Sequence, residues 1–262
     1  MATNSKIEWT NHTANLWWGC TKVHRGCDNC YAEAWASRFG EGLWGNDVPR
    51  RAIKSVWGNL QKWNETAKKA GEVHRVFVGS MMDIFEKPMP LTEGRTTEDL
   101  RQHFFAEVHK YPNLMFLLLT KRPSNIHKYI PDKWKKKQPV NVMYGASVVD
   151  RKSLKDVFRA FEKFHEKVQF RELRFFLSIE PLLEEIDLEK YIGRAEYPFP
   201  SWVIVGGESG PNKRPFNPDW ARLIQSDCDL YFLPFFMKQI DKVQPIPEDL
   251  MVREFPPEFQ LV

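Results

Sequence analysis

The sequence predicts a single α/β domain built as a complete or partial (β/α) barrel of about six or seven units. Apolar runs suited to strands alternate with charged stretches of helical periodicity along the 262 residues. Most of the apolar runs lack an in–out alternation, which is typical of strands covered on both faces. No linker interrupts the chain, so one domain is expected over residues 1–262, with a C-terminal extension at 240–262. A doubly wound open sheet is the competing arrangement.

Seven short apolar runs are the expected strands, and four longer amphipathic stretches are the expected helices between them. The strands are expected at Asn15–Trp18, Val76–Gly79, Met115–Thr120, Val142–Ser147, Arg174–Ile179, Trp202–Val205 and Tyr231–Phe236. The helices are expected at Tyr31–Phe39, Thr97–Lys110, Arg151–Lys167 and Pro218–Ser226.

Polar and charged residues follow each expected strand from the second onward. In (β/α) barrels the carboxyl ends of the strands share one rim, and functional sites are built there. A loop of cysteines follows the first strand and reaches the same rim, so the sequence predicts a site at this edge. The residues concerned are Ser80, Asp83, Lys121, Arg122, Ser147, Glu180, Gly206, Gly207, Glu208, Lys238 and Gln239.

Three of the four cysteines, Cys20, Cys27 and Cys30, lie close together near the start, whereas Cys228 is remote. A closed zinc site or a fully protein-ligated iron–sulfur cluster needs four ligands. Three thiolates on a four-iron cluster leave one iron open to a substrate or cofactor. Three clustered cysteines, one fewer than a closed site needs, therefore indicate a chemical role and not a purely structural one for a bound metal cluster.

Three interpretations of these cysteines remain open. The first is a [4Fe–4S] cluster, and the second is a Cys₃His zinc site that uses His12 or His24. The third is unligated cysteines packed as small apolar side chains, although the segment is polar. Disulfide pairing is disfavoured because three close cysteines leave an odd thiol.

Bulk properties indicate a cytoplasmic chain without a membrane segment. The start lacks the apolar run of a signal peptide, and the longest apolar run, Leu114–Leu119, is only strand-sized. A reducing compartment suits free thiolates and an oxygen-sensitive cluster.

The net charge of +4 is mild, and the basic runs at 62–69 and 133–137 are interpreted as solvated helix faces or, alternatively, as phosphate-binding patches. Seven of the ten tryptophans lie in the N-terminal quarter, where they either build a core, shield a cluster or stack on a base.

The glycine run at 206–210 lacks the spacing of a phosphate-binding loop, so it is interpreted as backbone that approaches a ligand closely. The chain also lacks the GxSxG and HExxH motifs of hydrolases and zinc proteases.

A three-cysteine loop after the first strand of such a barrel is similar to that of radical S-adenosylmethionine (SAM) enzymes. Their usual spacing is CxxxCxxC, whereas this chain has CxxxxxxCxxC, with a first gap longer by three. More specifically, the chain resembles the phage family of three-Cys-motif proteins. The stretches that carry this resemblance are 6–10, 19–32, 119–123, 178–183, 202–210 and 236–239.

The resemblance implies that Cys20, Cys27 and Cys30 hold a [4Fe–4S] cluster whose open iron binds SAM. Reduction, by a flavodoxin or ferredoxin, would then give a 5′-deoxyadenosyl radical that abstracts hydrogen from the substrate. Cofactor contacts are expected from Ser80, Asp83, Ser147, Glu180, Gly206 and Gly207, and catalytic residues are expected at Lys121, Arg122 and Glu208. The strand-two motif is Ser-Met-Met-Asp here, in place of the common Gly-Gly-Glu.

The substrate expected from this resemblance is a nucleobase, in DNA or in a modified nucleotide, that the enzyme isomerises or remodels. Lys121, Arg122, Lys213 and Arg214 are candidates for binding phosphate or a substrate carboxylate. A radical enzyme for a peptide or small metabolite is one alternative. A zinc- or cluster-bearing nucleic-acid-binding or sensor protein without catalysis is the other.

Overall fold

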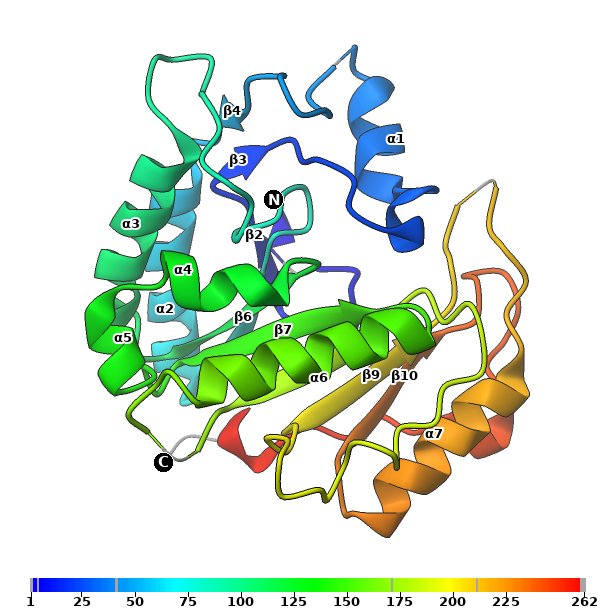
Figure 1. Ribbon diagram of the computed structural model, residues 1–262. Coiled ribbons are helices and arrows are strands. Elements are labelled where there is room, and N and C mark those ends of the chain that lie inside the picture. Colours follow the sequence, from blue (N-terminus) through cyan, green and yellow to red (C-terminus); the bar gives the residue numbers. More distant parts are fainter. Residues whose placement is uncertain (1, 4, 41, 171, 211, 260–262) are drawn as a thin grey trace.

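The central sheet is a curled, open half-barrel of parallel strands. The computed structural model describes residues 2–3, 5–40, 42–170, 172–210 and 212–259. Its main sheet has the strand order β1-β2-β5-β6-β7-β8-β9-β10, in which only the β1–β2 pair is antiparallel (Figure 1). The strands are β1 (Ala2–Thr3), β2 (His12–Ala14), β5 (His74–Val78), β6 (Leu114–Thr120), β7 (Val142–Val148), β8 (Phe175–Ile179), β9 (Trp202–Gly206) and β10 (Phe235–Gln239).

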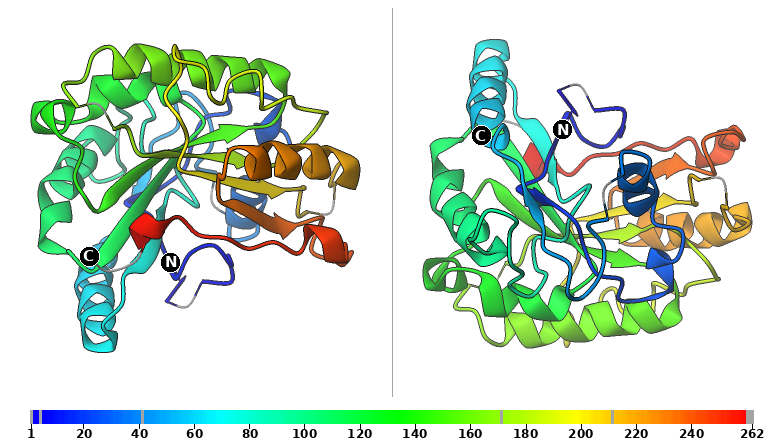
Figure 2. Two further views of the ribbon diagram at one scale, coloured as in Figure 1. Left: turned by 90° about the horizontal axis from the view of Figure 1, so that it is seen from below. Right: turned by 90° about the horizontal axis from the view of Figure 1, so that it is seen from above.

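Sequential strands are neighbours and their order never reverses, so the partial barrel is confirmed and the doubly wound sheet is excluded within the described residues. The views along the vertical axis show the sheet curling without closing (Figure 2).

Helices cover the convex face of the sheet. α2 packs against β5 and β6, α6 against β7, and α7 against β9. The helices are α1 (Tyr31–Ser37), α2 (Val56–Ala70), α3 (Thr97–Glu107), α4 (Ile126–Tyr129), α5 (Asp132–Lys136), α6 (Arg151–His165) and α7 (Pro218–Leu230). α3 and α6 begin with capping boxes at Thr96 and Asp150, which bind backbone N–H groups left free in the first turn.

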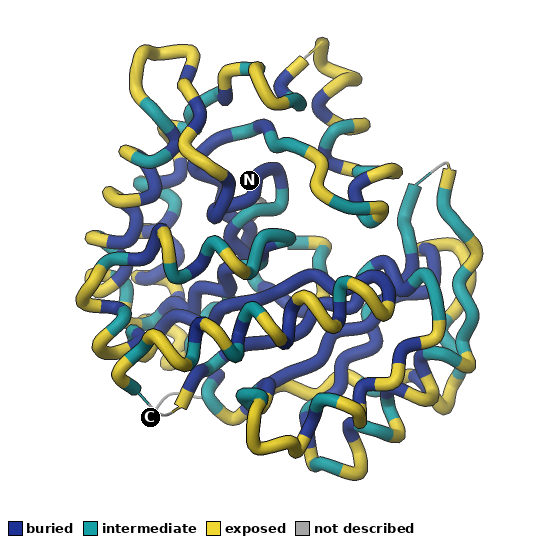
Figure 3. The backbone as a smooth tube through the Cα atoms, viewed as in Figure 1, coloured by how far each residue is buried: buried dark blue, intermediate teal, exposed yellow. Residues whose placement is uncertain are grey.

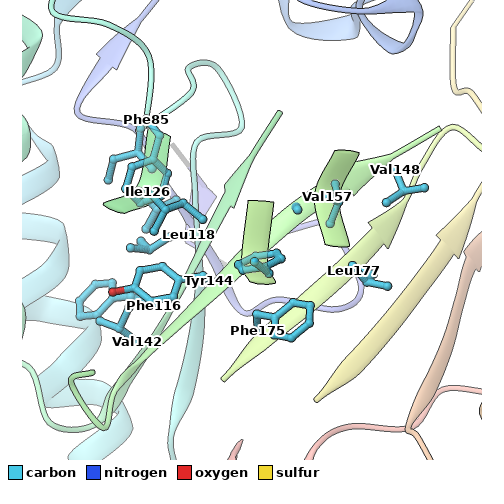
Figure 4. Packing of buried hydrophobic residues seen from close by; sticks show 14 of the residues in the cluster. Phe85, Phe116, Leu118, Ile126, Val142, Tyr144, Val148, Val157, Phe175 and Leu177 are labelled. Atoms are coloured by element: carbon cyan, nitrogen blue, oxygen red, sulfur yellow. The ribbon is translucent and has the colours of Figure 1, made fainter. Parts of the chain in front are cut away.

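Strands β6, β7, β8 and β9 bury both of their faces (Figure 3). One set of alternate residues, which includes Phe116, Tyr144 and Leu177, packs under the helices (Figure 4). The other set fills the concave face with Phe77, Leu117, Met143, Phe176 and Trp202, among others. This double burial explains the unbroken apolar runs in the sequence.

The first expected strand is misplaced. It was expected at Asn15–Trp18, but β2 is His12–Ala14. This strand looks polar in the sequence although it is buried. The His12 ring stacks on the Trp63 ring, with the ring centroids 4.4 Å apart. Trp17 and Trp18 instead form β3, which pairs with β4 (Arg51–Ala52) in a separate antiparallel ribbon.

The last expected strand and one helix also differ. β10 begins at Phe235 and not at Tyr231, because Phe232 adopts a positive φ of 54° in a turn and Pro234 precedes the strand. α2 was not predicted as an element, although its buried residues Val56, Leu60, Trp63 and Ala67 follow a helical spacing. Its lysines at 62, 68 and 69 are solvated as expected, whereas Trp63 and Asn64 in the same run are buried.

The chain after β10 closes the amino-terminal end of the half-barrel. Residues 252–254 pair with β10, and Arg253 forms an ion pair with Glu8 at 2.8 Å. Phe259 packs edge-on against Trp202 at 5.3 Å. The apolar concave face is therefore sealed at this end, and its polar end is opposite.

Candidate functional site

A large cavity opens at the carboxyl ends of the strands. Its volume is roughly 1300 Å³, counting the part open to solvent, which is ample for a small-molecule ligand. The predicted site residues that line it are Cys20, Cys27, Cys30, Ser80, Asp83, Lys121, Arg122, Ser147, Glu180, Gly207, Glu208 and Lys238, whereas Gly206, Lys213, Arg214 and Gln239 do not line it. The structure thus brings together, in one place, residues that are far apart in the sequence.

Gly206 lies deeper, where its Cα faces β10. A Cβ at this position would lie 3.5 Å from the Lys238 Cβ and 3.4 Å from the Gln239 backbone oxygen. At Gly207 a Cβ would meet the Ile240 backbone oxygen at 2.0 Å, so only glycine fits there.

The three N-terminal cysteines share one wall of the cavity and are free thiols. Cys20 follows Gly19, whose φ of 114° requires a glycine, and Cys30 is the N-cap residue of α1. Cys228 lies fully buried on the helix-covered side of the sheet, in α7. The fourth cysteine is therefore separated from the other three by the sheet.

Within the described residues, no three His, Cys, Asp or Glu side chains converge as a ready metal site. Ligands of a single zinc ion must converge on one point. The three cysteine ligands of a four-iron cube bind three different corners, so they stand farther apart. The three thiols line the cavity together but are not arranged around a single point.

Neither histidine considered for zinc completes a preformed site. His12 lies near the amino-terminal end of the sheet, where its Nε2 is 3.0 Å from the His74 Nδ1. Burial, assisted by His74, lowers the pKa of His12 to about 4. His24 caps the cysteine segment, with Nδ1 accepting from the Gly26 N–H at 3.1 Å.

Arg122 links the third strand exit to the cysteine segment. Its guanidinium donates to the Thr21 backbone oxygen at 2.6 Å and lies 3.7 Å from the Cys20 Sγ. Burial and the nearby Asp83 carboxylate nevertheless raise the pKa of the Cys20 thiol to about 12. A bound metal would reverse this, because metal ligation deprotonates a thiol.

Asp83 is a buried hub for this wall. Its Oδ1 accepts from the Thr120 hydroxyl at 2.7 Å and the Phe85 N–H at 2.9 Å. Its Oδ2 accepts from the Lys121 N–H at 3.0 Å and from Arg122 at 2.8 Å. Both carboxylate oxygens are therefore engaged within the protein.

Behind this wall lies a fully buried ion pair between Arg50 and Glu86, with contacts of 2.7 and 3.0 Å. Arg50 also donates to the backbone oxygens of Leu43, Val48 and Gly45 and to the Thr21 hydroxyl. This side chain fixes the path of the chain on both sides of α1.

Glu208 fastens the cysteine segment to the loop after β9. It pairs with Arg214 and accepts from Asn29 at 3.0 Å, while Arg214 donates to the Arg25 backbone oxygen at 3.0 Å. Burial opposes ionisation, but the hydrogen bonds from Arg214 and Asn29 hold the pKa of Glu208 below its usual value.

Ser147 and Ser178 form a polar floor on the concave face. They are register partners on β7 and β8, both are buried, and both line the cavity. Neither hydroxyl has a hydrogen-bond partner within the described residues, so both are free to bind a ligand. Beside them, Glu180 forms an ion pair with Lys238.

Most of the cations expected to bind phosphate are already paired. Arg122 is held by Asp83, Arg214 by Glu208, and Lys213 by Asp241 at 2.7 Å. In contrast, Lys121 and Lys242 line the cavity and form no ion pair in the part of the chain that is described. These two lysines are the charges available to an anionic ligand.

Several residues that line the cavity were not expected to contact a ligand. Ser178 and Lys238 were recognised only as strand exits, although the period of two from Glu180 and from Phe236 places them on the concave face. Tyr31 lines the cavity and donates from its hydroxyl to the Ser80 backbone oxygen at 2.8 Å. Nothing in the sequence signals Tyr31 or Lys242.

The structure also shows where the N-terminal tryptophans and the basic run at 133–137 lie. Trp9, Trp17 and Trp63 are buried in the core, whereas Trp35 is 40% exposed on α1. The basic run at 133–137 belongs to α5, which leads into the start of β7 and thus lies at the end of the sheet opposite the cavity (Figure 1).

Among the helices that the structure describes, none is long and apolar enough to cross a membrane. The chain matches no curated protein and no solved structure significantly. Residues 4–251 match the model of a family described as "Protein of unknown function (DUF5131)". Because this match spans almost the whole chain, the protein belongs to the DUF5131 family.

Proposed function

We propose that this protein is a radical SAM enzyme with a [4Fe–4S] cluster on Cys20, Cys27 and Cys30. The observation that carries the proposal is that three free thiols line one wall of a cavity whose other walls are polar strand ends, while Cys228 lies across the sheet. Three ligands leave one iron open for SAM. When bound and reduced, the cluster and SAM supply a 5′-deoxyadenosyl radical that abstracts a hydrogen atom from the substrate.

In this proposal the residues around the thiols act by positioning. Arg122, held by Asp83, offers positive charge beside Cys20 and favours its thiolate form. The Glu208–Arg214 pair holds the segment that carries Cys27 and Cys30. Asp83, Arg122 and Glu208 are thus assigned to the support of the cluster loop and not to direct contact with SAM or substrate.

The polar floor is assigned to the cofactor. The hydroxyls of Ser147 and Ser178 and the Glu180 carboxylate are suited to the hydroxyl and ammonium groups of SAM. Ser80 contributes through the loop that Asn15 and Tyr31 fix, and Gly207 lets backbone approach the ligand. Phe77 and Leu119 line the apolar part of the cavity and exclude water from the reacting atoms.

Lys121 is the residue assigned to the substrate, because its amine is unpaired and lines the cavity. Together with Lys242 it favours an anionic substrate, which supports a nucleotide unit whose base is isomerised or remodelled. The electron donor would be a flavodoxin or ferredoxin in the reducing cytoplasm. These assignments follow from the unpaired charges and from the resemblance in the cysteine spacing.

The test is anaerobic reconstitution with iron and sulfide, followed by reduction with dithionite in the presence of SAM. The proposal predicts a brown protein that forms 5′-deoxyadenosine, measured by mass spectrometry. A colourless, zinc-loaded protein that forms none would indicate a zinc-stabilised binding module. A brown protein that leaves SAM intact would indicate a cluster-bearing sensor.

A further inference from the structure

Exposed aromatic rings lie on α1 and directly after its last residue, Ser37. Tyr31, Trp35 and Phe39 follow one another at a spacing of four, and they are 50%, 40% and 64% exposed. The Trp35 ring lies 4.7 Å from Phe39 and 4.9 Å from Trp18, on which the Arg51 guanidinium stacks at 4.3 Å. We call Trp18, Tyr31, Trp35 and Phe39 together the α1 aromatic face.

Packing against the core explains Trp18 but not the exposure of Trp35 and Phe39. α1 packs inward through Ala32 and Ala36, which contact Met81. The two alanines already join the helix to the domain, and in Figure 3 the outer side of α1 is exposed. Neighbouring large rings that remain exposed are typical of a binding surface.

The α1 aromatic face is continuous with the cavity. Tyr31 belongs to both, and Cys30, Ala32 and Trp44 line the cavity beside it. An occupant of the cavity that is longer than one unit would therefore leave it over Trp35 and Phe39. This geometry favours a polymer whose reacting unit enters the cavity.

Charge identifies the kind of polymer. The three carboxylates that line the cavity, Asp83, Glu180 and Glu208, are each paired with a cation. Lys121 and Lys242 remain unpaired at the cavity, and Arg38 is exposed directly after α1. A cationic cavity beside flat, exposed rings is the combination that binds single-stranded nucleic acid, through phosphate contacts and base stacking.

We propose that a single strand of nucleic acid binds across the α1 aromatic face, with bases stacked on Trp35 and Phe39 and one nucleotide inside the cavity. A duplex would have to extrude that nucleotide first, so single strands bind better. The inference rests on the proposed function only in treating the cavity as the reaction site. The binding itself requires neither cluster nor SAM.

The test is the affinity of the full-length protein for a fluorescein-labelled single-stranded oligothymidylate, measured by anisotropy at several salt concentrations. A Trp35→Ala/Phe39→Ala variant is expected to bind about ten- to a hundredfold more weakly, with an unchanged salt dependence. Trp35→Phe should retain most of the affinity because it keeps a stacking ring. Lys121→Gln/Lys242→Gln should instead flatten the salt dependence.

Two matched controls make the result specific. Phe232→Ala removes a ring that is 95% exposed in the turn before β10, away from the cavity, and should leave binding unchanged. Neutralising the lysines at 133 and 135–137, in α5 and at its C-terminal cap, should also have little effect, because α5 lies at the opposite end of the sheet. Circular dichroism and the melting temperature establish that each variant is folded, and Phe39→Ala alone serves if the double variant is not.

Unchanged affinity in the folded Trp35 and Phe39 variants would overturn the inference. Equal affinity for duplex and single strand would also overturn it. A third contrary result would be that the protein binds anionic vesicles but not the oligonucleotide, and that the same variants abolish the binding to vesicles. If the oligonucleotide binds as expected but no 5′-deoxyadenosine forms, only the proposed function fails.

Discussion

Arg50 is the buried side chain on which the wall behind the cysteines depends. It neutralises Glu86 and satisfies three backbone oxygens, and both charged groups are inaccessible to solvent. Arg50→Met would leave the Glu86 carboxylate with Arg122, at 3.7 Å, as its remaining ion-pair partner among the described residues. Removing one partner of a buried pair costs about 3–5 kcal/mol of folding free energy, so we expect a loss of that size in urea denaturation.

Lys54→Met provides the matched control for Arg50→Met. Lys54 is 82% exposed and pairs with Glu93 at 3.2 Å. Exposed pairs contribute at most about 1 kcal/mol. Similar losses in the two variants would contradict the assignment of Arg50 as a structural centre.

His12 makes stability depend on pH. Its pKa is lowered to about 4 by burial, so the unfolded chain binds a proton between about pH 6.5 and 4 that the folded chain does not. The free energy of unfolding should therefore fall by roughly 3 kcal/mol through this residue as the pH drops across that range. His12→Phe, which keeps a ring against Trp63, should reduce this slope, as measured by urea denaturation at each pH. An unchanged slope would show that His12 does not carry it.

At the scale of elements, the cysteine segment is a loop held from two sides. Arg122 holds it near Cys20, and Arg214 with Glu208 holds residues 25–29. Arg214→Met should raise hydrogen exchange of the amides at 25–29 and lower the iron content after reconstitution, with little change in global stability. Exchange is measured by mass spectrometry.

Arg222→Met is the comparison for Arg214→Met. Arg222 is an exposed arginine on α7 that also bridges two acidic residues, Asp219 and Asp249. It should not alter exchange at 25–29. If both variants raised exchange at 25–29, the effect would come from the loss of a positive charge and not from the contacts of Arg214 with Glu208 and with the Arg25 backbone oxygen.

The elements show what the sequence could and could not predict. Unbroken apolar runs located the inner strands, because both faces of those strands are buried. The first strand was misplaced because His12 and Thr13 are polar residues that are nevertheless buried. The start of the last strand was misplaced because Phe232 is an apolar residue that is nevertheless exposed. Local pattern cannot reveal burial that depends on a distant partner such as Trp63.

The candidate site was predictable to the level of its rim. Parallel strands bring their ends to one edge, so residues after separate strands had to meet there. The pairing inside the rim was not predictable, since Glu208 with Arg214 and Asp83 with Arg122 depend on loop conformations. Asp83, Arg122 and Glu208 were expected to contact ligands, but in the structure they form ion pairs within the protein.

At the scale of the whole molecule, segments from both ends of the described chain cover the amino-terminal end of the open half-barrel. Phe259 seals the concave face against Trp202, and Arg253 binds Glu8. Phe259→Ala should cost about 3–5 kcal/mol of folding free energy in urea denaturation, because a buried ring leaves a cavity. Phe232→Ala, which removes an exposed ring, should cost less than about 0.5 kcal/mol. Equal costs would show that residues 252–259 do not contribute to the core.

The central claim is that three cysteines on one wall of the cavity hold an iron–sulfur cluster with an open iron. It is tested most directly by iron and sulfide content after anaerobic reconstitution of four variants: Cys20→Ala, Cys27→Ala, Cys30→Ala and Cys228→Ala. We predict four irons in the unaltered protein and in Cys228→Ala, and loss of the cluster in each of the other three. Retention of the cluster in any of those three, or its loss in a folded Cys228→Ala, would contradict the account.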